Sequence, residues 1–364
     1  MTAPRIQLTV DLRSDVLSRP TPAMWEAMAS TDIGLYDFDD DSTVHTLEAR
    51  VAEIAGKEAG FYAVTGRVAN ITALMSLAGG DRPLVRESRS HLAVNERAGI
   101  TAIARIPAYD LLGDSLGEMD AGELAEVVRE AGRRHRTGPV VALENTHSAA
   151  GGCALTVAAT TELSAAAREA GATYVYVDGA RLWNAAVALR TPIQDLLAPI
   201  DAAMLSLSKG LGGPFGAVVV GSAVVIKAVR QQAHLLGALS VHRMGYLAAA
   251  GLVALDTRAG KLEEDHRRAR LLANGLASIE GLRVDFRSVQ TNLVRVEVTA
   301  PSLNASSFVQ GLSGYGIGAT VIEPPGAVRL AVYHQITDDD INSAIRAAEL
   351  VAAEATSTNF ANRS

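Results

Sequence analysis

Two ionisable residues each follow an apolar, strand-like run, in the position that the carboxyl end of a strand would give them. Asp178 directly follows the run Tyr174–Val177, and Lys209 comes shortly after the run Ala202–Leu207. The two residues are 31 positions apart, a spacing that suits one right-handed strand–helix–strand crossover. Ligands of doubly wound sheets lie outside the carboxyl ends of the strands. We therefore expect both side chains to face one crevice.

This pair of residues is suited to one kind of cofactor chemistry. A buried lysine with a depressed pKa is a Schiff-base nucleophile, and a carboxylate beside it would keep a pyridine nitrogen protonated. The glycine-rich run Gly210–Gly216 directly follows Lys209 and favours tight turns. Together these features predict a pyridoxal phosphate site, in which the cofactor is the electron sink. The alternative is a surface lysine and a strand-end aspartate without any chemistry.

A phosphate group is bound well by free backbone N–H groups at the start of a helix. The segment Val64–Asn70 follows a short apolar run and opens the helix-like stretch Val68–Leu77. Within it, Gly66 permits close approach of the backbone and Arg67 adds positive charge. Ser206, three residues before the lysine, is a second candidate for contact with the phosphate. Each feature also fits an ordinary loop-to-helix turn or a strand hydroxyl inside the core.

The order of the elements predicts the class of fold. Strand-like and helix-like runs alternate over most of the chain, which indicates an α/β fold with a largely parallel sheet covered on both faces. After about residue 255 the pattern changes to an α+β order of helices and short strands. We expect a large domain over residues 1–254, a smaller domain over 255–355 and a disordered tail over 356–364.

The composition argues against several classes of protein. The 364 residues carry a formal net charge of −7 without a basic patch, so we expect no nucleic-acid partner. The longest apolar run, Phe215–Ile226, is interrupted by Gly221 and is too short to span a bilayer. The N-terminus lacks the apolar segment of a secretory signal. A single cysteine, Cys153, excludes an internal disulfide and a multi-cysteine zinc site. We expect a cytoplasmic protein with no metal and no membrane partner.

Two other functions fit the residues less well. A non-catalytic regulator built on the same fold would need a DNA-binding domain, and we expect none before Asp11. A nicotinamide-dependent dehydrogenase would need a Gly-x-Gly-x-x-Gly turn between a strand and a helix. Here Gly210–Gly216 follows a lysine, and the segment after it is strand-like.

Four blocks of the sequence resemble the L-threonine aldolases, from about residue 9 to about residue 350: DLRSD (Asp11–Asp15), LENTH (Leu143–His147), VDGARLWNAA (Val177–Ala186) and LSKGLGGPFG (Leu207–Gly216). The resemblance implies fold type I of the pyridoxal phosphate enzymes, the aspartate aminotransferase-like fold, with a mostly parallel seven-stranded sheet and a smaller α+β C-terminal domain. It also implies cleavage, or the reverse synthesis, of an L-β-hydroxy-α-amino acid to glycine and an aldehyde, by a homodimer or homotetramer with shared active sites. A transaldolase or a β-eliminating lyase acting on a related amino acid is the alternative.

The resemblance also implies roles for single residues around the cofactor. Lys209 matches the lysine that binds the cofactor covalently, and Asp178 matches the partner of the pyridine nitrogen. His91 matches a histidine that stacks on the cofactor ring, and His147 a second histidine near the substrate hydroxyl. Histidine suits general base catalysis at neutral pH, so we expect both histidines to be catalytic together with the lysine. Gly66 matches the glycine of the phosphate-binding turn.

A second set of matched residues concerns the substrate carboxylate. Arg181 and Arg329 match two arginines that bind this carboxylate in the family, and Ser14 matches a serine close to it. The planar guanidinium fork binds a carboxylate with two parallel hydrogen bonds, which is why arginine suits this task. Either arginine, and either histidine above, could instead have only a structural role.

The chain departs from the family pattern around the phosphate and at the rim of the site. Thr65–Asn70 is TGRVAN where the family has SGTMAN, so Arg67 stands in place of a threonine. The segments Phe38–Thr43 and Gly237–Arg243 also differ, and Ser148 replaces the asparagine that ends the family's ENTHN. We predict a changed substrate or a changed phosphate site. In the latter, Arg67 supplies charge that the family takes from an arginine in its GGGMRQ segment.

Overall fold

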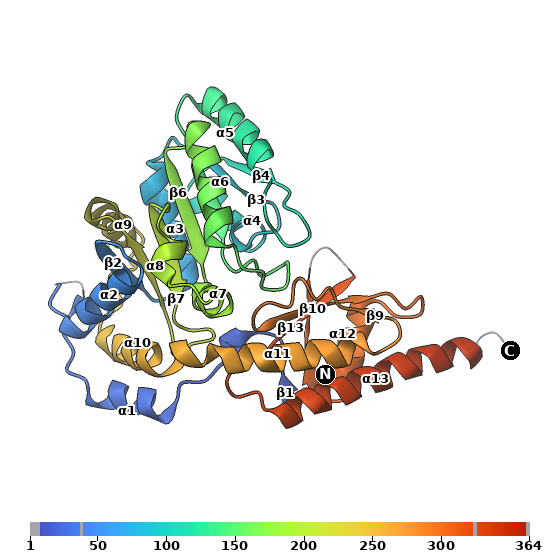
Figure 1. The fold of residues 1–364 in the computed structure, drawn as a ribbon. Helices are drawn as coiled ribbons and strands as arrows, with labels where there is room; N and C mark the ends of the chain where they lie inside the picture. The colour runs from blue at the N-terminus through green and yellow to red at the C-terminus, as the bar shows by residue number, and fades with distance from the viewer. Residues whose placement is uncertain (1–7, 37–38, 323–325, 362–364) are drawn as a thin grey trace.

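The computed structural model describes residues 8–36, 39–322 and 326–361. The larger part is a seven-stranded sheet in the order β2-β8-β7-β6-β5-β3-β4 (Figure 1). The pairs from β7 through β6, β5 and β3 to β4 are all parallel, whereas β8 runs antiparallel to both β7 and β2. The predicted α/β class with a mostly parallel seven-stranded sheet is confirmed.

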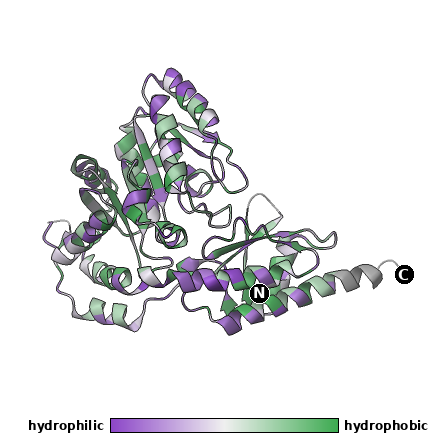
Figure 2. Cartoon of the chain, viewed as in Figure 1, coloured by the Kyte–Doolittle hydropathy of each residue, from purple (hydrophilic) through white to green (hydrophobic). Residues whose placement is uncertain are grey.

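The strands of this sheet are short and buried. β5, β6 and β7 are buried almost throughout, as expected of strands covered by helices on both faces. Figure 2 shows that the strands of this sheet are largely green, the colour of hydrophobic residues. The strands are β2 (Ala59–Ala63), β3 (Leu84–Glu87), β4 (Ala108–Leu111), β5 (Val140–Glu144), β6 (Tyr174–Gly179), β7 (Ala202–Ser206) and β8 (Ala217–Gly221).

The helices of the larger part are α1 (Pro22–Ser30), α2 (Ser42–Ile54), α3 (Gly66–Ala78), α4 (His91–Val94), α5 (Ala121–His135), α6 (Val157–Glu169), α7 (Leu182–Leu189), α8 (Ile193–Leu196), α9 (Ala223–Leu235) and α10 (Gly245–Arg258). Side chains at the N-caps set the starts of several of them. Asp41 of α2, Thr65 of α3 and Ser222 of α9 each accept a hydrogen bond from the backbone N–H three residues later.

The smaller part is a four-stranded antiparallel sheet in the order β12-β13-β10-β9. Its strands are β9 (Leu282–Arg283), β10 (Leu293–Val298), β12 (Thr320–Ile322) and β13 (Ala327–Ala331), accompanied by helices α11 (Leu262–Ala277), α12 (Ala305–Gly314) and α13 (Asp338–Ala361). It has its own hydrophobic core, separate from the core around the seven-stranded sheet. The predicted small α+β C-terminal part is therefore present.

The N-terminal segment belongs to the smaller core. β1 (Val10–Asp11) pairs in parallel with β11 (Ile317–Gly318), and Val10 and Leu12 are buried in that core. The sequence instead predicts that the N-terminal segment goes with the large domain of residues 1–254. A strand pairing between residues about 300 positions apart leaves no local pattern in the sequence from which it could be predicted. Leu262 is the last residue of the larger core, and the smaller core continues from Ala269. The two cores therefore support the predicted domain boundary near residue 255, which stays a prediction.

The expected disordered tail differs from the structure over residues 356–361, which continue α13 to Ala361. The polar composition had suggested fraying, but no glycine or proline interrupts the segment Asp338–Ala361 and stops the helix. Residues 362–364 lie outside the described part of the chain. No helix in the described residues is long and apolar enough to cross a bilayer.

Candidate active site

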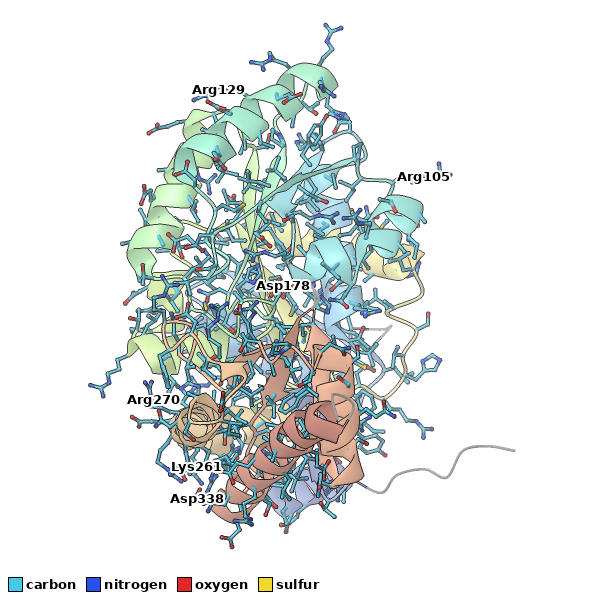
Figure 3. The ribbon with its side chains drawn as sticks, turned by 90° about the vertical axis from the view of Figure 1, so that its right-hand side faces the viewer. Arg105, Arg129, Asp178, Lys261, Arg270 and Asp338 are labelled. Carbon is cyan, nitrogen blue, oxygen red and sulfur yellow. The ribbon has the colours of Figure 1, made fainter. Side chains whose placement is uncertain are left out.

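Four neighbouring strands end in polar residues at one edge of the large sheet. Glu87 ends β3, Glu144 ends β5, Asp178 lies one residue before the end of β6, and Ser206 ends β7. Because these strands are parallel, their carboxyl ends meet at the same edge, and Glu144 is the register partner of Asp178. Figure 3 shows Asp178 in the interior, whereas the labelled arginines and Lys261 lie toward the outside.

Lys209 follows β7 at this edge, as predicted. The turn after it requires glycine at residue 212, whose φ is 73° and where a Cβ would lie 2.9 Å from a ring carbon of His334. The backbone carbonyl of Lys209 accepts hydrogen bonds from the Ser18 hydroxyl (2.7 Å) and the Gly212 amide (2.8 Å). Its ammonium has no hydrogen-bond partner in the described residues. Burial, aided by the charge of Arg181, lowers the pKa of Lys209 to about 8. A neutral, nucleophilic amine is thus accessible near neutral pH.

Asp178 is fully enclosed beside this lysine. Burial and the charge of Glu144 raise the pKa of Asp178 to about 6. Its carboxylate accepts a hydrogen bond of 3.0 Å from Asn70 Nδ2, and its other oxygen accepts one from the Ala180 amide. A carboxylate with a raised pKa is one that lacks a cationic partner. A protonated pyridine nitrogen would supply that missing charge.

The predicted phosphate turn opens helix α3. Thr65 is the N-cap and accepts a hydrogen bond of 3.1 Å from the Val68 amide. The amides of Gly66 and Arg67, the first two residues of the helix, have no partner in the part of the chain that is described. The Arg67 side chain is exposed, and Ser206 is buried at the end of β7. Two free amides at a helix start suit a phosphate group.

Arg181 has a partner that the sequence argument did not assign to it. Its Nε and Nη2 donate to the two carboxylate oxygens of Asp15 at 2.8 and 2.7 Å, and both side chains are buried. Burial alone would raise the pKa of Asp15, but the Arg181 charge holds it below the ordinary value. Asn292 of the smaller part donates to the same carboxylate at 3.0 Å. These two bonds use two of the five N–H donors of Arg181, so both hydrogens of Nη1 and the second hydrogen of Nη2 are left to bind a substrate carboxylate.

The second predicted arginine lies on β13 of the smaller sheet. Arg329 Nη1 donates to the Ser148 hydroxyl at 2.9 Å, and Nη2 donates to the Arg13 carbonyl at 3.3 Å. Its Nε is buried without a hydrogen-bond partner among the residues described. Burial and the charge of Arg181 lower the pKa of Arg329 to about 10. Ser14 precedes both arginines in the sequence and is the N-cap of the short 3-10 helix Asp15–Leu17.

This arginine pair is suited to an anion. Burial and the charge of Arg181 lower the pKa of Arg329, whereas the charge of Asp15 outweighs burial and raises the pKa of Arg181. Arg329 forms no ion pair with a described residue, so a carboxylate would neutralise its charge. Ser148, which replaces the family's asparagine, is the residue that holds one of them in place.

His91 begins helix α4 and keeps one ring nitrogen free. Its Nδ1 lies 2.8 Å from Glu96 Oε1, and its backbone amide donates to Glu144 at 2.5 Å. No described residue bonds to its Nε2. Burial alone would lower the pKa of His91, but the hydrogen bond to Glu96 and the nearby carboxylates raise it. The structure thus offers a basic nitrogen at the crevice.

His147 differs from His91, because both of its ring nitrogens have partners. Nε2 lies 2.9 Å from Glu87 Oε2, and Nδ1 accepts a hydrogen bond of 3.3 Å from the Ala150 amide. The side chain is buried, and the charges of Glu144 and Glu87 outweigh burial and raise its pKa. The catalytic role of His147 stays a prediction, and the free nitrogen favours His91 as the group nearest the substrate.

The pair of Glu87 and His147 leads to a pH-dependent prediction for stability. The pKa of Glu87 is lowered to about 2, since His147 and Arg89 outweigh its burial. The ionised Glu87 carboxylate therefore stabilises the folded state above pH 4.5, the ordinary pKa of a glutamate, and this stabilisation is lost as the pH falls toward 2. The His147 contribution is present below its ordinary pKa of 6.5 and is lost as the pH rises through its higher native value.

We therefore expect Glu87→Gln to destabilise the protein most between about pH 4.5 and 6.5, by about 3 kcal/mol. Denaturant unfolding at pH 5.5 and pH 9 measures the difference, with the exposed Glu126→Gln as the matched control. The loss should be smaller at pH 9, where neutral His147 still donates its Nε2–H to Glu87 but no longer carries a charge. An equal loss at both pH values would contradict a charge interaction with His147.

The residues present fit pyridoxal phosphate, on three observations. The ammonium of Lys209 has no partner in the described ranges, Asp178 lacks a cation, and the first amides of α3 are free. Sequence reasoning missed Glu96, Glu87 and the role of Asp15. The strand-end rule that identified Asp178 would also have found Glu87, which ends β3.

The acidic segment at the predicted rim has a structural role where it is described. Asp41 is fully buried, caps α2 and accepts a hydrogen bond from the Gly245 amide at 3.0 Å. Asp39 forms an ion pair of 3.2 Å with His45. Phe38, also part of the predicted rim, lies outside the described residues.

Comparison with known proteins identifies relatives of this chain. The family model described as "Beta-eliminating lyase" matches residues 11–299. Low-specificity L-threonine aldolase 1 of Arabidopsis thaliana is 33% identical over 343 residues, which are 93% of this chain and 94% of the relative. The low specificity L-threonine aldolase of Escherichia coli K12 is 32% identical over 291 residues, which are 79% and 84% of the two chains. The Leishmania major threonine aldolase shares the fold, with a TM-score of 0.79 at 18% identity over 94% of this chain and 99% of that one. The chain therefore belongs to the L-threonine aldolase family within the β-eliminating lyases, and it is a pyridoxal phosphate-dependent lyase of fold type I.

Proposed function

We propose that the chain cleaves L-threonine and related L-β-hydroxy-α-amino acids to glycine and an aldehyde. The observation that carries the proposal is Lys209, whose ammonium has no hydrogen-bond partner in the described residues, near the buried Asp178, which forms no ion pair with a described residue, at the edge where the strands of the large sheet end. The names of the relatives from Arabidopsis thaliana and Escherichia coli support the same reaction.

Each residue of the site has a task in this reaction. Bound pyridoxal phosphate supplies the electron sink for the pair that is released when the Cα–Cβ bond breaks. Asp178 would hold the pyridine nitrogen in its protonated form, and the start of α3 would hold the phosphate. The free Nε2 of His91 is placed to accept the proton of the substrate hydroxyl as the bond breaks.

The substrate carboxylate would bind between the two arginines. Arg181 would offer Nη1 and the second hydrogen of Nη2, because Asp15 accepts one hydrogen each from Nε and Nη2. Arg329 offers its unpartnered Nε, and Ser14 lies on the segment that carries Asp15. This arrangement fixes the amino acid by its carboxylate and leaves the β-substituent as the variable part of the substrate.

The test is aldehyde release from L-threonine by purified, cofactor-loaded protein, measured with a coupled alcohol dehydrogenase. We expect glycine and acetaldehyde in equal amounts. Protein that carries the cofactor absorbance yet releases no aldehyde from L-threonine or a bulkier β-hydroxy amino acid would contradict the proposal. Adding a second aldehyde separates the alternative: a new β-hydroxy amino acid in place of free glycine would indicate a transaldolase.

Arg67 provides a separate prediction about the cofactor. The side chain is exposed at the second position of α3 and has no ion pair within the residues described. Arg67→Thr restores the family residue and removes one charged contact to a phosphate. We expect cofactor affinity to fall about tenfold, the effect of a single, partly screened charged hydrogen bond. Fluorescence titration of the apo protein measures it, with the exposed Arg129→Thr as control. Unchanged affinity would contradict a phosphate role for Arg67.

We also infer that the protein acts in the cytoplasm as a homodimer or homotetramer with shared active sites. The support is the exposure of large apolar side chains near the crevice: Phe215 follows the lysine turn, and Val16 and Leu17 follow Asp15, each with more than a third of its surface exposed. Light scattering coupled to size-exclusion chromatography tests the assembly, and a monomer would contradict it.

A further inference from the structure

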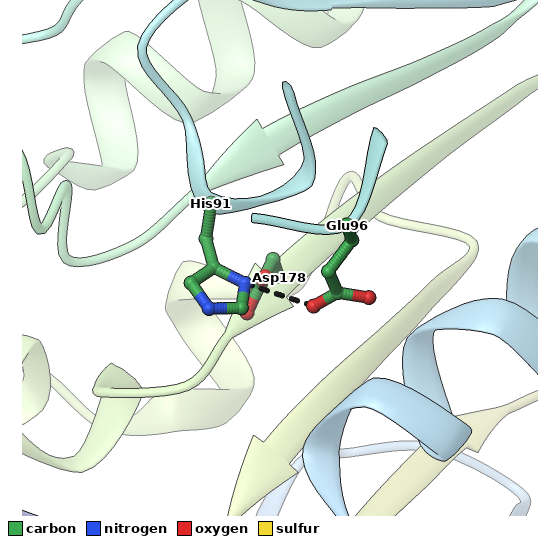
Figure 4. A group of neighbouring side chains, drawn as sticks. All are labelled: His91, Glu96 and Asp178. Atoms are coloured by element: carbon green, nitrogen blue, oxygen red, sulfur yellow. Dashed lines mark hydrogen bonds and ion pairs between the residues drawn. The ribbon is translucent and has the colours of Figure 1, made fainter. Parts of the chain in front are cut away.

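Glu96 is a buried carboxylate that joins the two predicted ring contacts of the cofactor. Its side chain is only 4% exposed. Its Oε1 lies 2.8 Å from His91 Nδ1 and accepts a hydrogen bond of 2.9 Å from Asn70 Nδ2. The same Asn70 nitrogen donates to Asp178 at 3.0 Å. Figure 4 shows the ring of His91 with Nδ1 turned toward Glu96 and Asp178 behind the ring.

The amide of Asn70 keeps two buried anions close together. Single oxygens of Glu96 and Asp178 and a nitrogen of His91 all lie within 4.8 Å of one another. Asn70 Nδ2 has two hydrogens and donates one to each carboxylate, while the Tyr176 hydroxyl donates to Asn70 Oδ1 at 2.7 Å and fixes the amide orientation. The five side chains form one continuous hydrogen-bonded network that ends at His91.

The network decides which nitrogen of His91 carries the proton. An ionised carboxylate only accepts hydrogen bonds, so Nδ1 of His91 must be the donor to Glu96. A neutral imidazole has one N–H, so the lone pair is then on Nε2. Nε2 is the nitrogen without a partner in the described residues. To accept a proton from the substrate, His91 needs this free lone pair on Nε2.

No other charged group takes this place. Asp178 of β6 and Glu144 of β5 also face His91, and Glu144 accepts the hydrogen bond of the His91 backbone amide. Of the described carboxylates, Glu96 alone bonds to the ring. Glu144 therefore orients the backbone of α4, whereas Glu96 orients the imidazole.

We propose that Glu96 is a positioning residue, which selects the Nδ1–H tautomer of His91 and keeps Nε2 as the proton acceptor, while Asn70 holds Asp178 in the same network. The catalytic consequence rests on the function proposed above, but the tautomer does not. A histidine whose second nitrogen is held by a carboxylate is fixed both in orientation and in protonation pattern.

The test is the ¹⁵N spectrum of the eight histidines in cofactor-loaded protein, where the His91 signals are those lost in His91→Gln. In the unmodified protein we expect neutral His91 as the Nδ1–H tautomer. Glu96→Gln keeps an acceptor oxygen but removes the charge, so the tautomer should persist while the titration midpoint falls by about one pH unit. Glu96→Ala removes the acceptor, so the Nε2–H tautomer should appear. Glu126→Gln on the exposed face of α5 is the charge-matched control and should change neither.

Two results would overturn the proposal: His91 in the Nε2–H form in the unmodified protein, or the same tautomer in folded Glu96→Ala as in the parent. A purely structural role would lower stability in Glu96→Ala and leave the tautomer as it is. If Glu96→Ala does not fold, an unchanged midpoint in Glu96→Gln contradicts the proposal instead.

The steady-state kinetics of the same Glu96 variants are the second measurement. The acid limb of kcat/KM should move to lower pH in Glu96→Gln. In Glu96→Ala, kcat should fall about 10- to 100-fold, which is less than the about 10²- to 10⁴-fold that a general base itself contributes, because the base is misplaced and not removed. If neither the unmodified protein nor any variant releases aldehyde, the proposed function is wrong. The tautomer of His91 in the ¹⁵N spectra still decides the role of Glu96 in that case.

Discussion

Lys209→Ala is expected to lower aldehyde release from L-threonine by at least about 10³-fold, because it removes the nucleophile that binds the cofactor covalently. The fold should persist, since the ammonium makes no hydrogen bond in the described structure that alanine would break. The variant should also lose the visible absorbance of the lysine-bound cofactor. Its apo form should be no less stable than the parent, since an unpaired interior cation has been removed.

The chain offers a direct control for this prediction. It has four lysines, of which Lys227 lies exposed on α9. Lys227→Ala should keep both activity and absorbance. Borohydride reduction followed by peptide mass spectrometry should place the cofactor on Lys209 alone. Cofactor labelling of any other lysine would contradict the assignment.

The rate of cofactor attachment should depend on pH in a defined direction. The pKa of Lys209 is lowered from 10.5 to about 8. The reactive neutral amine therefore grows as the pH rises through about 8. We expect faster reconstitution of the apo protein at pH 8.5 than at pH 7, followed by absorbance.

Asp178→Asn is the second change with a large expected effect, and it should act on activity and stability in opposite directions. Asparagine cannot hold a positive charge on the pyridine nitrogen, so aldehyde release should fall about 10²- to 10³-fold, the usual effect of removing one preorganised electrostatic contact. The amide oxygen can still accept the hydrogen bond from Asn70, so the surrounding network should remain.

The stability of the apo protein should rise in the same variant. The pKa of Asp178 is raised from 3.8 to about 6, so the native state keeps this proton while the unfolded chain loses it. Native stability therefore falls as the pH rises through that interval, and the penalty persists above it. Removing the charge should stabilise the apo form at pH 8 by about 2 kcal/mol. Denaturant unfolding tests this, with the exposed Asp195→Asn as control. A destabilised apo variant would contradict the direction of the shift.

Local patterns were sufficient to find the residues that we propose bind the cofactor. Asp178 and Lys209 were predicted from strand-like runs that end in an ionisable residue, and Gly66 from a turn that opens a helix. The structure brings all three to the elements expected, because parallel strands must present their carboxyl ends at one edge. The mostly parallel sheet followed from the same alternation of strand-like and helix-like runs.

The partners of those residues were not predictable in the same way. Arg181 is held by Asp15, 166 positions away, and Asp178 by Asn70, 108 positions away. Which of many polar residues meet across such separations depends on how the segments are packed, and no periodicity records it. The docking of β1 on β11, which brings Asp15 to Arg181, is one example.

Glu96 shows the limit even at short range. It lies five positions after His91, and helical spacing would not turn the two side chains toward each other. They meet because α4 ends at Val94 and the chain turns at Asn95, so that the Glu96 side chain points back under the imidazole. The sequence by itself determined the fold class and the cofactor and predicts the lysine that binds it, since these depend on residue type and on short-range pattern. Only the tertiary structure decided which arginine nitrogens stay free and which histidine nitrogen carries a proton, because those depend on contacts between segments that fold together from distant parts of the chain.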